Sequence, residues 1–327
     1  MSKNAVTLLG LGLLLLTLTS TLWIAGLASE SDDAHPAARQ LRQTAAHAIQ
    51  PIAADSVADL RQAFAAFDYT WPPVAPHGVP PLALQQLPKD FADISDAEQR
   101  KSLFLRAVLP IVLMENRRLQ EQRDLATLLL KHRFPATDSA PYHWLKELAQ
   151  ELHIHGDLRE EAVQATLLRR LDQIPPALAL AQAAIESGWG SSRFALEGNS
   201  LFGQWTFNGE AGLEPNERDS EATHFVAHFP NLRASVRAYM RNLNTNHAYR
   251  EFRNARAALR QARKPLSPTE LAGHLQRYSQ RGKDYVRELL RIINGRTLAM
   301  LPGQPATTSG PPATLALYGS WPLVTDS

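Results

Sequence analysis

The feature that most constrains this chain is a short helix-forming segment that ends on two glycines and carries one carboxylate beside them. Pro176 suits the first position of a helix, where its missing N–H is not needed. The Ala- and Leu-rich residues after it are strong helix formers, and Gly188 and Gly190 can adopt the left-handed conformation that ends a helix. Glu186 is therefore predicted to lie in the last turn of a helix that is apolar on most of its surface.

This position is unfavourable for an ionised acid. The C-terminal end of a helix is the negative pole of its dipole. Four aromatic residues that follow can shield the carboxyl group from water and raise its pKa; they are Trp189, Phe194, Phe202 and Trp205. Because a carboxyl group that stays protonated near neutral pH can donate its proton to a leaving oxygen, we predict that Glu186 is a general acid. The alternative is a solvated glutamate beside a helix end.

Three motifs follow one another around this acid. Residues 178–190 end in Glu186-Ser187-Gly188-Trp189-Gly190, residues 192–195 read Ser-Arg-Phe-Ala, and residues 198–205 read Gly-Asn-Ser-Leu-Phe-Gly-Gln-Trp. Together they resemble the glucosaminidase domain of glycoside hydrolase family 73, in particular that of the Bax-type proteins of Gram-negative bacteria. The resemblance implies a mainly α, lysozyme-like helical domain with a small β-hairpin lobe beside the cleft. It also implies cleavage of β-1,4 bonds next to N-acetylglucosamine in peptidoglycan, with Glu186 as the catalytic acid.

A second carboxylate is expected, because glycoside hydrolysis usually employs two acids. In the family it is sought in the β-lobe, where this chain offers Glu210, Glu214, Glu217, Asp219 and Glu221. We favour Glu221, which stands at the mouth of the second predicted strand. If none of them faces Glu186, the acetamido group of the substrate can assist instead, or the enzyme can be a lytic transglycosylase that uses Glu186 alone. A catalytically inactive glycan-binding wall protein is the alternative outside the enzymes.

The predicted β-lobe carries the expected substrate contacts. Two strands are predicted at residues 199–207 and 223–229, with a polar loop between them. Gln204 and Trp205 are expected to contact sugar, since aromatic rings stack on pyranose faces and amides bond hydroxyl groups. The complete set that we assign to substrate binding is Trp189, Asn199, Phe202, Gln204 and Trp205.

A second region of resemblance lies near the C-terminal end of the domain. Residues 275–286 resemble the family's Tyr-Ser/Ala-x-x-Gly-x-x-Tyr segment. The resemblance implies that Tyr278, the first tyrosine, lines the active site, where it bonds the substrate acetamide or orients water. A core tyrosine with a satisfied hydroxyl group is the alternative, and Tyr285 is expected to pack in the core.

Composition excludes several other classes of function. The net charge of +2 suits an anionic cell wall but is too small to indicate nucleic-acid binding. The chain has no cysteine, which excludes disulfides, thiolate zinc sites and a cysteine nucleophile. His153 and His155 fall on different faces of a helix, and His224 and His228 lie in a strand-like stretch, so we predict no metal site. No cofactor is implied.

The N-terminus predicts export. Lys3 precedes an uncharged, Leu-rich run over residues 4–29, and acidic residues follow it. Such a run is long enough to span a bilayer, and the flanking charges place the remainder of the chain outside the inner membrane. It can be a membrane anchor or a cleaved signal peptide. We therefore predict a periplasmic protein, tethered to the inner membrane through residues 4–29 if this segment is not cleaved.

The remaining domain organisation follows from composition and periodicity. We predict a signal peptide or membrane anchor at 1–29, an Ala/Gln-rich and then Pro-rich linker at 30–78, the glucosaminidase domain with an N-terminal helical extension at 79–297, and a disordered tail at 298–327. Apolar residues at helical spacing predict helices near residues 104–129, 142–152, 160–171 and 232–243. The predicted partner is the glycan strand of peptidoglycan.

Overall fold

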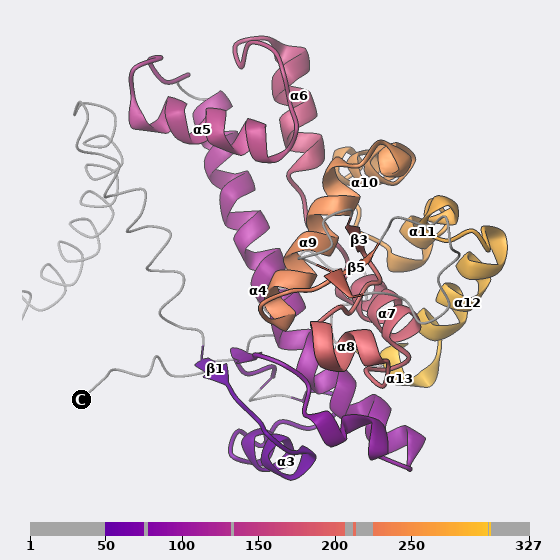
Figure 1. Cartoon of the computed structure of the whole chain (residues 1–327). Helices are drawn as coiled ribbons and strands as arrows, with labels where there is room; N and C mark the ends of the chain where they lie inside the picture. The colour runs from indigo at the N-terminus through magenta and orange to yellow at the C-terminus, as the bar shows by residue number, and fades with distance from the viewer. Residues whose placement is uncertain are drawn as a thin grey trace, which may run out of the picture. The chain divides into compact units, whose positions relative to one another are not determined.

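The computed structural model describes residues 50–74, 78–131, 134–206, 212–213, 225–299 and 301. These residues divide into two compact units: residues 124–168 form one, and residues 50–123 with those from 169 onward form the other. The chain is mainly helical (Figure 1), which confirms the predicted fold class. The α-helices of the described chain are α3 (Val57–Ala65), α4 (Ala97–Lys131), α5 (Ala140–Glu151), α6 (Glu161–Arg170), α7 (Pro176–Ser187), α8 (Arg193–Gly198), α9 (Leu232–Thr245), α10 (Arg250–Gln261), α11 (Pro268–Ala272), α12 (Lys283–Ile293) and α13 (Arg296–Ala299).

Helix α7 occupies the interior of the larger unit. Nearly all of its residues are buried, and it packs against α11 and α12 (Figure 1). Its short alanine side chains permit this close approach of neighbouring helices. The first part of α4 adds a continuous apolar stretch that includes Phe104, Val108 and Ile111, all fully buried. These helices form the core on which the candidate site is built.

An ion-pair cluster joins α4 to α9 within this unit. The carboxylate of Glu115 is fully buried and accepts bonds from Arg233 Nε at 2.6 Å, Arg237 Nε at 2.9 Å and Arg118 Nε at 2.9 Å. Burial by itself would raise the pKa of Glu115, but the three guanidinium groups lower it to about 2. We call these four residues the Glu115 cluster.

The linker predicted at 30–78 is folded over the part of it that the structure describes. Strand β1 (Gln50–Ile52) pairs in parallel with β2 (Leu82–Leu84), and α3 begins at a capping box formed by Ser56 and Asp59. Leu60 and Phe64 of α3 are buried, and Trp71 Nε1 donates to the carbonyl of Thr297 at 3.0 Å. Residues 50–74 therefore belong to the folded unit, because this segment buries apolar side chains. The Ala/Gln-rich composition of the predicted linker does not indicate this burial.

The C-terminal boundary also shifts slightly. The sequence predicts that the tail begins at residue 298, but Leu298 in α13 is fully buried and Leu301 is buried as well. The first residues of the predicted tail thus pack against the unit. Residues 300 and 302–327 lie outside the described chain, as do residues 1–49.

The predicted β-lobe is present with shorter strands. Strand β3 (Trp205–Thr206) pairs antiparallel with β5 (Phe225–Ala227), as the hairpin prediction requires. A third strand, β4 (Gly212–Leu213), pairs with the other edge of β5 and gives the order β3-β5-β4. Residues 199–204 are not a strand, because Asn199 instead ends helix α8 in the left-handed conformation.

The helices predicted before the catalytic segment are confirmed. The single helix α4 covers residues 104–129, and α5 and α6 match the predictions at 142–152 and 160–171 to within two residues. The hydroxyl group of Ser139 caps the start of α5, and the helix buries Leu145 and Leu148. Helix α9 likewise matches the prediction at 232–243. The 3-10 helices that connect these elements are η1 (Lys89–Asp93), η3 (His247–Tyr249) and η4 (Gln276–Tyr278).

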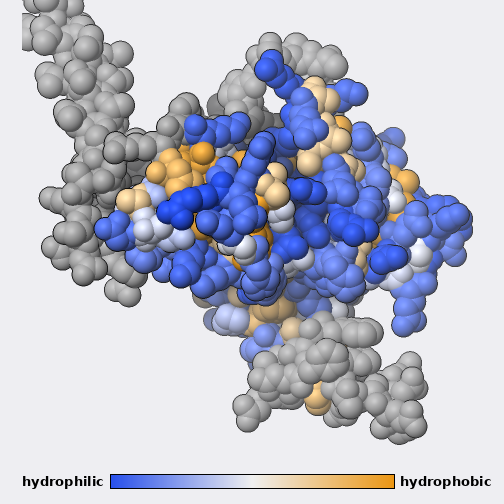
Figure 2. Space-filling model, turned by 90° about the horizontal axis from the view of Figure 1, so that it is seen from above, coloured by the Kyte–Doolittle hydropathy of each residue, from blue (hydrophilic) through white to orange (hydrophobic). Residues whose placement is uncertain are grey.

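The face shown in Figure 2 is mainly hydrophilic where the structure describes it. Among the described residues, the exposed large hydrophobic side chains are those of Val74, Leu125 and Leu128. No helix in this part of the chain has both the length and the apolar character needed to cross a membrane; the predicted anchor at 4–29 lies outside it. His153 and His155 are exposed, and within the described ranges no group of His, Asp and Glu residues is arranged to hold a metal ion.

Candidate active site

Helix α7 ends as its glycines predict. Gly188 has the left-handed conformation, with φ 58° and ψ 44°, and the N–H of Trp189 donates to the Ala184 carbonyl at 2.8 Å. The hydroxyl group of Ser187 accepts from the N–H of Gly190 at 2.9 Å. These bonds satisfy the end of the helix and hold Glu186 in its last turn, one residue before the buried Ser187.

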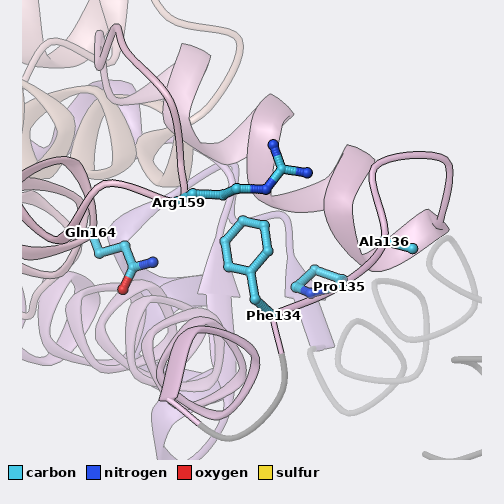
Figure 3. Close-up of a pocket in the computed structure, with 5 residues that line it drawn as sticks. All are labelled: Phe134, Pro135, Ala136, Arg159 and Gln164. Carbon is cyan, nitrogen blue, oxygen red and sulfur yellow. The ribbon is translucent and has the colours of Figure 1, made fainter.

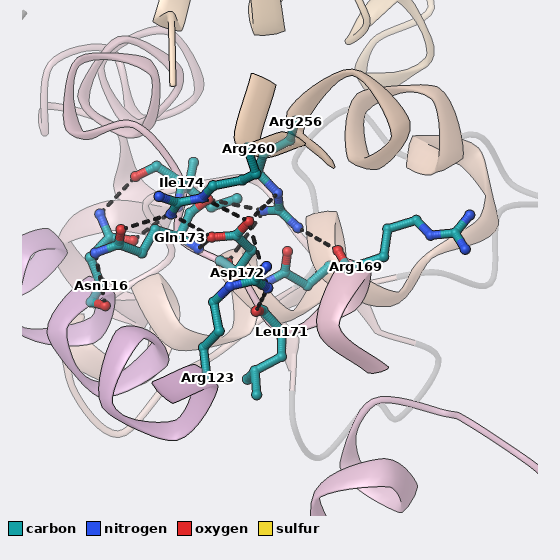
Figure 4. A network of polar contacts seen from close by, with 10 residues as sticks. Asn116, Arg123, Arg169, Leu171, Asp172, Gln173, Ile174, Arg256 and Arg260 are labelled. Atoms are coloured by element: carbon teal, nitrogen blue, oxygen red, sulfur yellow. Dashed lines mark hydrogen bonds and ion pairs between the residues drawn. The ribbon is translucent and has the colours of Figure 1, made fainter. Parts of the chain in front are cut away.

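A polar network holds the other end of α7. Figure 4 shows Arg256 and Arg260 of α10 reaching the buried Asp172, which precedes the helix; Arg260 Nη2 lies 2.8 Å from Asp172 Oδ1. Asn116 of α4 bonds both backbone groups of Ile174, at 2.7 and 2.9 Å. Burial would raise the pKa of Asp172, but the surrounding arginines lower it below its usual value. The network thus fixes where α7 starts.

Glu186 is a partly buried acid with an elevated pKa. Burial raises the pKa of its carboxyl group, and the charge of Glu288 raises it further; a hydrogen bond with Tyr285 and the charge of Arg281 oppose this rise, but do not cancel it. Arg281 and Glu288 form an ion pair with each other at 2.7 Å. The elevated pKa that the sequence predicted is therefore confirmed in direction, although its main cause is burial within the fold.

Four tyrosines surround this carboxyl group. Burial raises the pKa of each one, and the charge of Glu186 raises it further; they are Tyr239, Tyr249, Tyr278 and Tyr285. Tyr278 stacks on Tyr285 with ring centroids 5.6 Å apart, and its hydroxyl group donates to the Phe202 carbonyl at 3.2 Å. Tyr278 thus lies near the acid, as the resemblance implied, and Tyr285 is both packed in the core and bonded to the acid.

The segment after α8 lies beside the acid. Gly203 has a φ of +58°, and a side-chain carbon at this position would lie 3.5 Å from Glu186 Oε2. Asn199 Nδ2 donates to the Phe229 carbonyl at 3.0 Å, which ties α8 to the residues after β5. Within the described residues, the buried Oε1 of Gln204 and the hydroxyl group of Ser200 have no hydrogen-bond partner. The backbone of this segment therefore passes close to the carboxyl group of Glu186 at Gly203.

Two of the predicted substrate contacts are corrected. Phe202 is 2% exposed, and its ring stacks on Tyr239 with centroids 3.9 Å apart. The ring therefore packs in the core, and it is not accessible for stacking on a sugar. Asn199 is also buried; its amide nitrogen is bonded to the Phe229 carbonyl, and its Oδ1 is buried without a partner within the described residues. Sequence reasoning could not separate these roles, because a residue beside a site and a residue that supports it have the same spacing.

The other predicted site residues have different outcomes. Trp189 is half-buried and packs on Phe104, with Lys101 5.6 Å from its ring centre, and its contact with substrate stays a prediction. Trp205 belongs to β3, but its side chain lies outside what the structure describes. Glu221 and the other four acids of the predicted loop also lie outside the described residues, so the second carboxylate stays a prediction.

Three residues near Glu186 escaped the sequence analysis: Gln182, Tyr285 as a bonding partner, and Glu288. Gln182 lies four residues before Glu186, and Tyr285 and Glu288 are three apart in α12, so each pair shares a helix face. This helical spacing was visible in the sequence. The packing of α12 on α7, which brings the two faces together, was not.

A separate pocket lies in the unit formed by residues 124–168. It is lined by Phe134, Pro135, Ala136, Arg159 and Gln164 (Figure 3), and the guanidinium group of Arg159 lies over the ring of Phe134 at 5.8 Å. These five residues include no carboxylate. The pocket therefore lacks the acid that glycoside chemistry needs, and the candidate active site is the surroundings of Glu186.

Comparisons with known proteins agree with this assignment. The family model described as "Glucosaminidase: Mannosyl-glycoprotein endo-beta-N-acetylglucosaminidase" matches residues 162–298, which contain Glu186 and all four tyrosines. The chain is 34% identical over 204 residues to "Protein bax" of Escherichia coli (strain K12), a match that covers 61% of this chain and 72% of that protein. No solved structure matches the chain.

Proposed function

Because this chain belongs to the family of Bax-type proteins with a family 73-like glucosaminidase domain, we propose that it hydrolyses the β-1,4 bond next to N-acetylglucosamine in peptidoglycan. The match to the glucosaminidase family supports a glycosidase activity related to peptidoglycan. The proposal that this chain cleaves the glycosidic bond by acid catalysis rests on the position and the raised pKa of Glu186. Its carboxyl group stands at the end of a buried helix, and burial raises its pKa.

The proposed reaction uses Glu186 as the general acid. The protonated carboxyl group donates its proton to the glycosidic oxygen while the bond between that oxygen and the sugar's anomeric carbon breaks. The oxygen leaves as a neutral hydroxyl group. Water then supplies the hydroxyl group that the anomeric carbon gains and the proton that restores Glu186. An acid with an elevated pKa suits this step because it is protonated closer to neutral pH.

We keep Glu221 as the proposed second carboxylate, which activates the water or forms the glycosyl-enzyme intermediate. Among the described carboxylates, Glu288 is the one whose charge raises the pKa of Glu186. Its carboxylate is already paired with Arg281. We therefore assign Glu288 an electrostatic effect on the acid. A combined test compares Glu221→Gln with Glu288→Gln: we expect the first to abolish cleavage and the second to retain it.

The proposed substrate contacts are Gln204, Trp205 and Tyr278. The unpartnered amide oxygen of Gln204 can accept a hydrogen bond from a sugar hydroxyl group or an acetamido N–H. We propose that Tyr278 and Trp205 line the same site. Gln204→Leu should therefore weaken substrate binding by about tenfold, in line with the loss of one hydrogen bond to a polar ligand, while the thermal unfolding temperature changes little.

Digestion of purified peptidoglycan by the full chain tests the reaction. Products are identified by mass spectrometry for the wild type, for Glu186→Gln, and for a control variant, Glu197→Gln, which changes an exposed acid paired with Arg193 in α8. We expect reducing-end N-acetylglucosamine products from the wild type and the control but not from Glu186→Gln. Anhydro-muramyl products would identify a lytic transglycosylase instead. Retained wall binding without cleavage would identify an inactive glycan-binding protein.

We also propose that the chain acts in the periplasm, with residues 4–29 as a signal peptide or an inner-membrane anchor. The uncharged run after Lys3 supports this. Fractionation of cells that produce the full chain tests it: recovery with periplasmic contents indicates a cleaved signal, and recovery with membranes indicates an anchor. Recovery with the cytosol contradicts the proposal.

A further inference from the structure

We propose that Gln182 is a positioning residue that aims the hydroxyl proton of Tyr285 at the carboxylate of Glu186. The inference rests on the proposed function for its catalytic meaning, and the contacts that Gln182 makes with the two tyrosines carry it. The hydroxyl group of Tyr239 donates to Gln182 Oε1 at 2.8 Å. Gln182 Nε2 donates in turn to the hydroxyl oxygen of Tyr285 at 2.9 Å. Tyr285 lies in α12, which packs on α7, and its hydrogen bonding to Glu186 lowers the pKa of that carboxyl group. We call this chain of four groups the Gln182 relay.

The relay has a direction because an amide group has two different ends. Its oxygen can only accept and its nitrogen can only donate. Since the oxygen accepts from Tyr239, the nitrogen faces Tyr285 and occupies a lone pair of that hydroxyl group. The single proton of Tyr285 is therefore free to point at Glu186. The reversed amide would draw this proton toward Gln182 and leave the carboxylate without it.

The members of the relay are held in place from several sides. Gln182 and Tyr239 are fully buried and Tyr285 nearly so, and a buried amide without partners would be costly. Tyr239 stacks on Phe202 and Tyr285 stacks on Tyr278. These ring contacts restrict both tyrosines, so the relay is organised before any substrate arrives.

Gln182 is an exception in the sequence of α7. Its buried residues from 177 to 184 are alanine and leucine except for Gln182. A polar side chain in this stretch lowers the apolar burial of the helix and needs a compensating role. Because Gln182 is four residues before Glu186, both side chains lie on the same face, where they meet Tyr285 of α12.

The relay should lower the pKa of Glu186 and orient its carboxyl group. A hydrogen bond donated to a carboxylate stabilises its charged form, and an accepted bond makes the Tyr285 hydroxyl group a stronger donor. On the scale of those effects, Tyr285→Phe should raise the pKa of Glu186 by about one unit. Gln182→Met, which keeps the volume but removes both bonds, should raise it by roughly half a unit.

Carbon-13 NMR titration of labelled glutamate carboxyl groups in the full chain measures this pKa directly, with the Glu186→Gln spectrum assigning the signal. The decisive comparison is the double variant Gln182→Met/Tyr285→Phe. If Gln182 acts through Tyr285, the double variant has the pKa of Tyr285→Phe alone. If the Met side chain raises the pKa of Glu186 only by excluding water from the site, the pKa shifts of the two single variants add in the double variant. That result refutes the relay.

Two further variants keep the test decisive. Gln173→Met removes another buried amide that bonds Asn116 and Arg260; it should lower stability and leave the pKa of Glu186 unchanged, and an equal shift there overturns the proposal. If Gln182→Met does not fold, Tyr239→Phe removes only the first donor and should shift the pKa in the same direction. No shift in Tyr239→Phe would then count against the relay.

The titration also separates this inference from the proposed function. A pKa that rises in Gln182→Met supports the relay even if the wild type cleaves no glycan, in which case only the hydrolase proposal fails. If the wild type does cleave peptidoglycan, Gln182→Met should reduce kcat about tenfold with little change in KM, because the carboxyl group is less well oriented. The alkaline limit of its activity should also move to higher pH by roughly half a unit, as the pKa of Glu186 does in the NMR titration.

Discussion

Replacing Glu115 by glutamine should destabilise the chain in a way that depends on pH. The carboxylate is buried between Arg118, Arg233 and Arg237, which lower its pKa from 4.5 to about 2. A lowering of this size corresponds to roughly 3 kcal/mol of stability at neutral pH. Because the arginines are partly exposed and can turn toward water, we expect Glu115→Gln to lose about 2–3 kcal/mol.

The sign of the pH dependence follows from the lowered pKa. A carboxylate with a lower pKa in the folded state stabilises that state above its unfolded pKa, near 4.5, and loses this effect as pH falls toward about 2. By this relation the contribution falls from roughly 3 kcal/mol at pH 7 to roughly 1 kcal/mol at pH 3. The stability gap between wild type and Glu115→Gln should therefore shrink by more than half on acidification.

Urea unfolding followed by circular dichroism at pH 7 and pH 3 measures this gap. The matched control is Glu121→Gln, which removes an exposed acid from a pair with Arg117 on the same helix and should cost less than about 0.5 kcal/mol at either pH. Equal stability of Glu115→Gln and wild type at pH 7 would refute the argument. So would a gap of the same size at both pH values, because it would show a packing effect without charge.

Three further predictions concern the site and its support. Arg281→Gln should move the alkaline limit of cleavage to higher pH and Glu288→Gln should move it to lower pH, because the two charges act oppositely on the pKa of Glu186; pH–rate profiles check this, and shifts of the same sign would contradict it. Gly203→Ala should destabilise by about 1–2 kcal/mol because of its positive φ and slow cleavage because the new carbon contacts Glu186; thermal unfolding and digestion check this, and unimpaired cleavage would contradict it. Asp172→Ala should cost about 3–5 kcal/mol because it leaves the buried Arg256 without its acid; calorimetry checks this, and a change below about 1 kcal/mol would refute it.

Local sequence signals were sufficient for most of the helices. Pro176, the alanines and Gly188 carry the start, interior and end of α7 in consecutive residues, and the structure has the helix at these positions. Segment 50–74 was misassigned because its stability is not local. Trp71 bonds Thr297 and Arg106 bonds the Tyr69 carbonyl, and no window of the sequence contains both partners of the first contact.

The same distinction separates the parts of the site. Glu186 and Tyr278 were accessible because each belongs to a short recognisable motif. Phe202 was misplaced because the motif shows that a residue is near the acid but not which way its ring faces. Gln182 and Glu288 carry no motif, and their proximity to Glu186 depends on how α12 packs against α7.

The acidity of Glu186 is consequently a property of two helices. Helix α7 supplies the carboxyl group and buries it, which raises its pKa. Helix α12 supplies Tyr285 and Glu288, and the turn before it supplies Arg281; these three residues adjust that pKa in both directions. A change that loosens α12 while leaving α7 intact would remove these adjustments together and expose the acid to water. Such a chain would retain its family motif and its helix content, yet its acid would titrate like an ordinary glutamate. Retention of the motif is therefore insufficient evidence of activity in a member of this family, and the packing of α12 has to be considered with it.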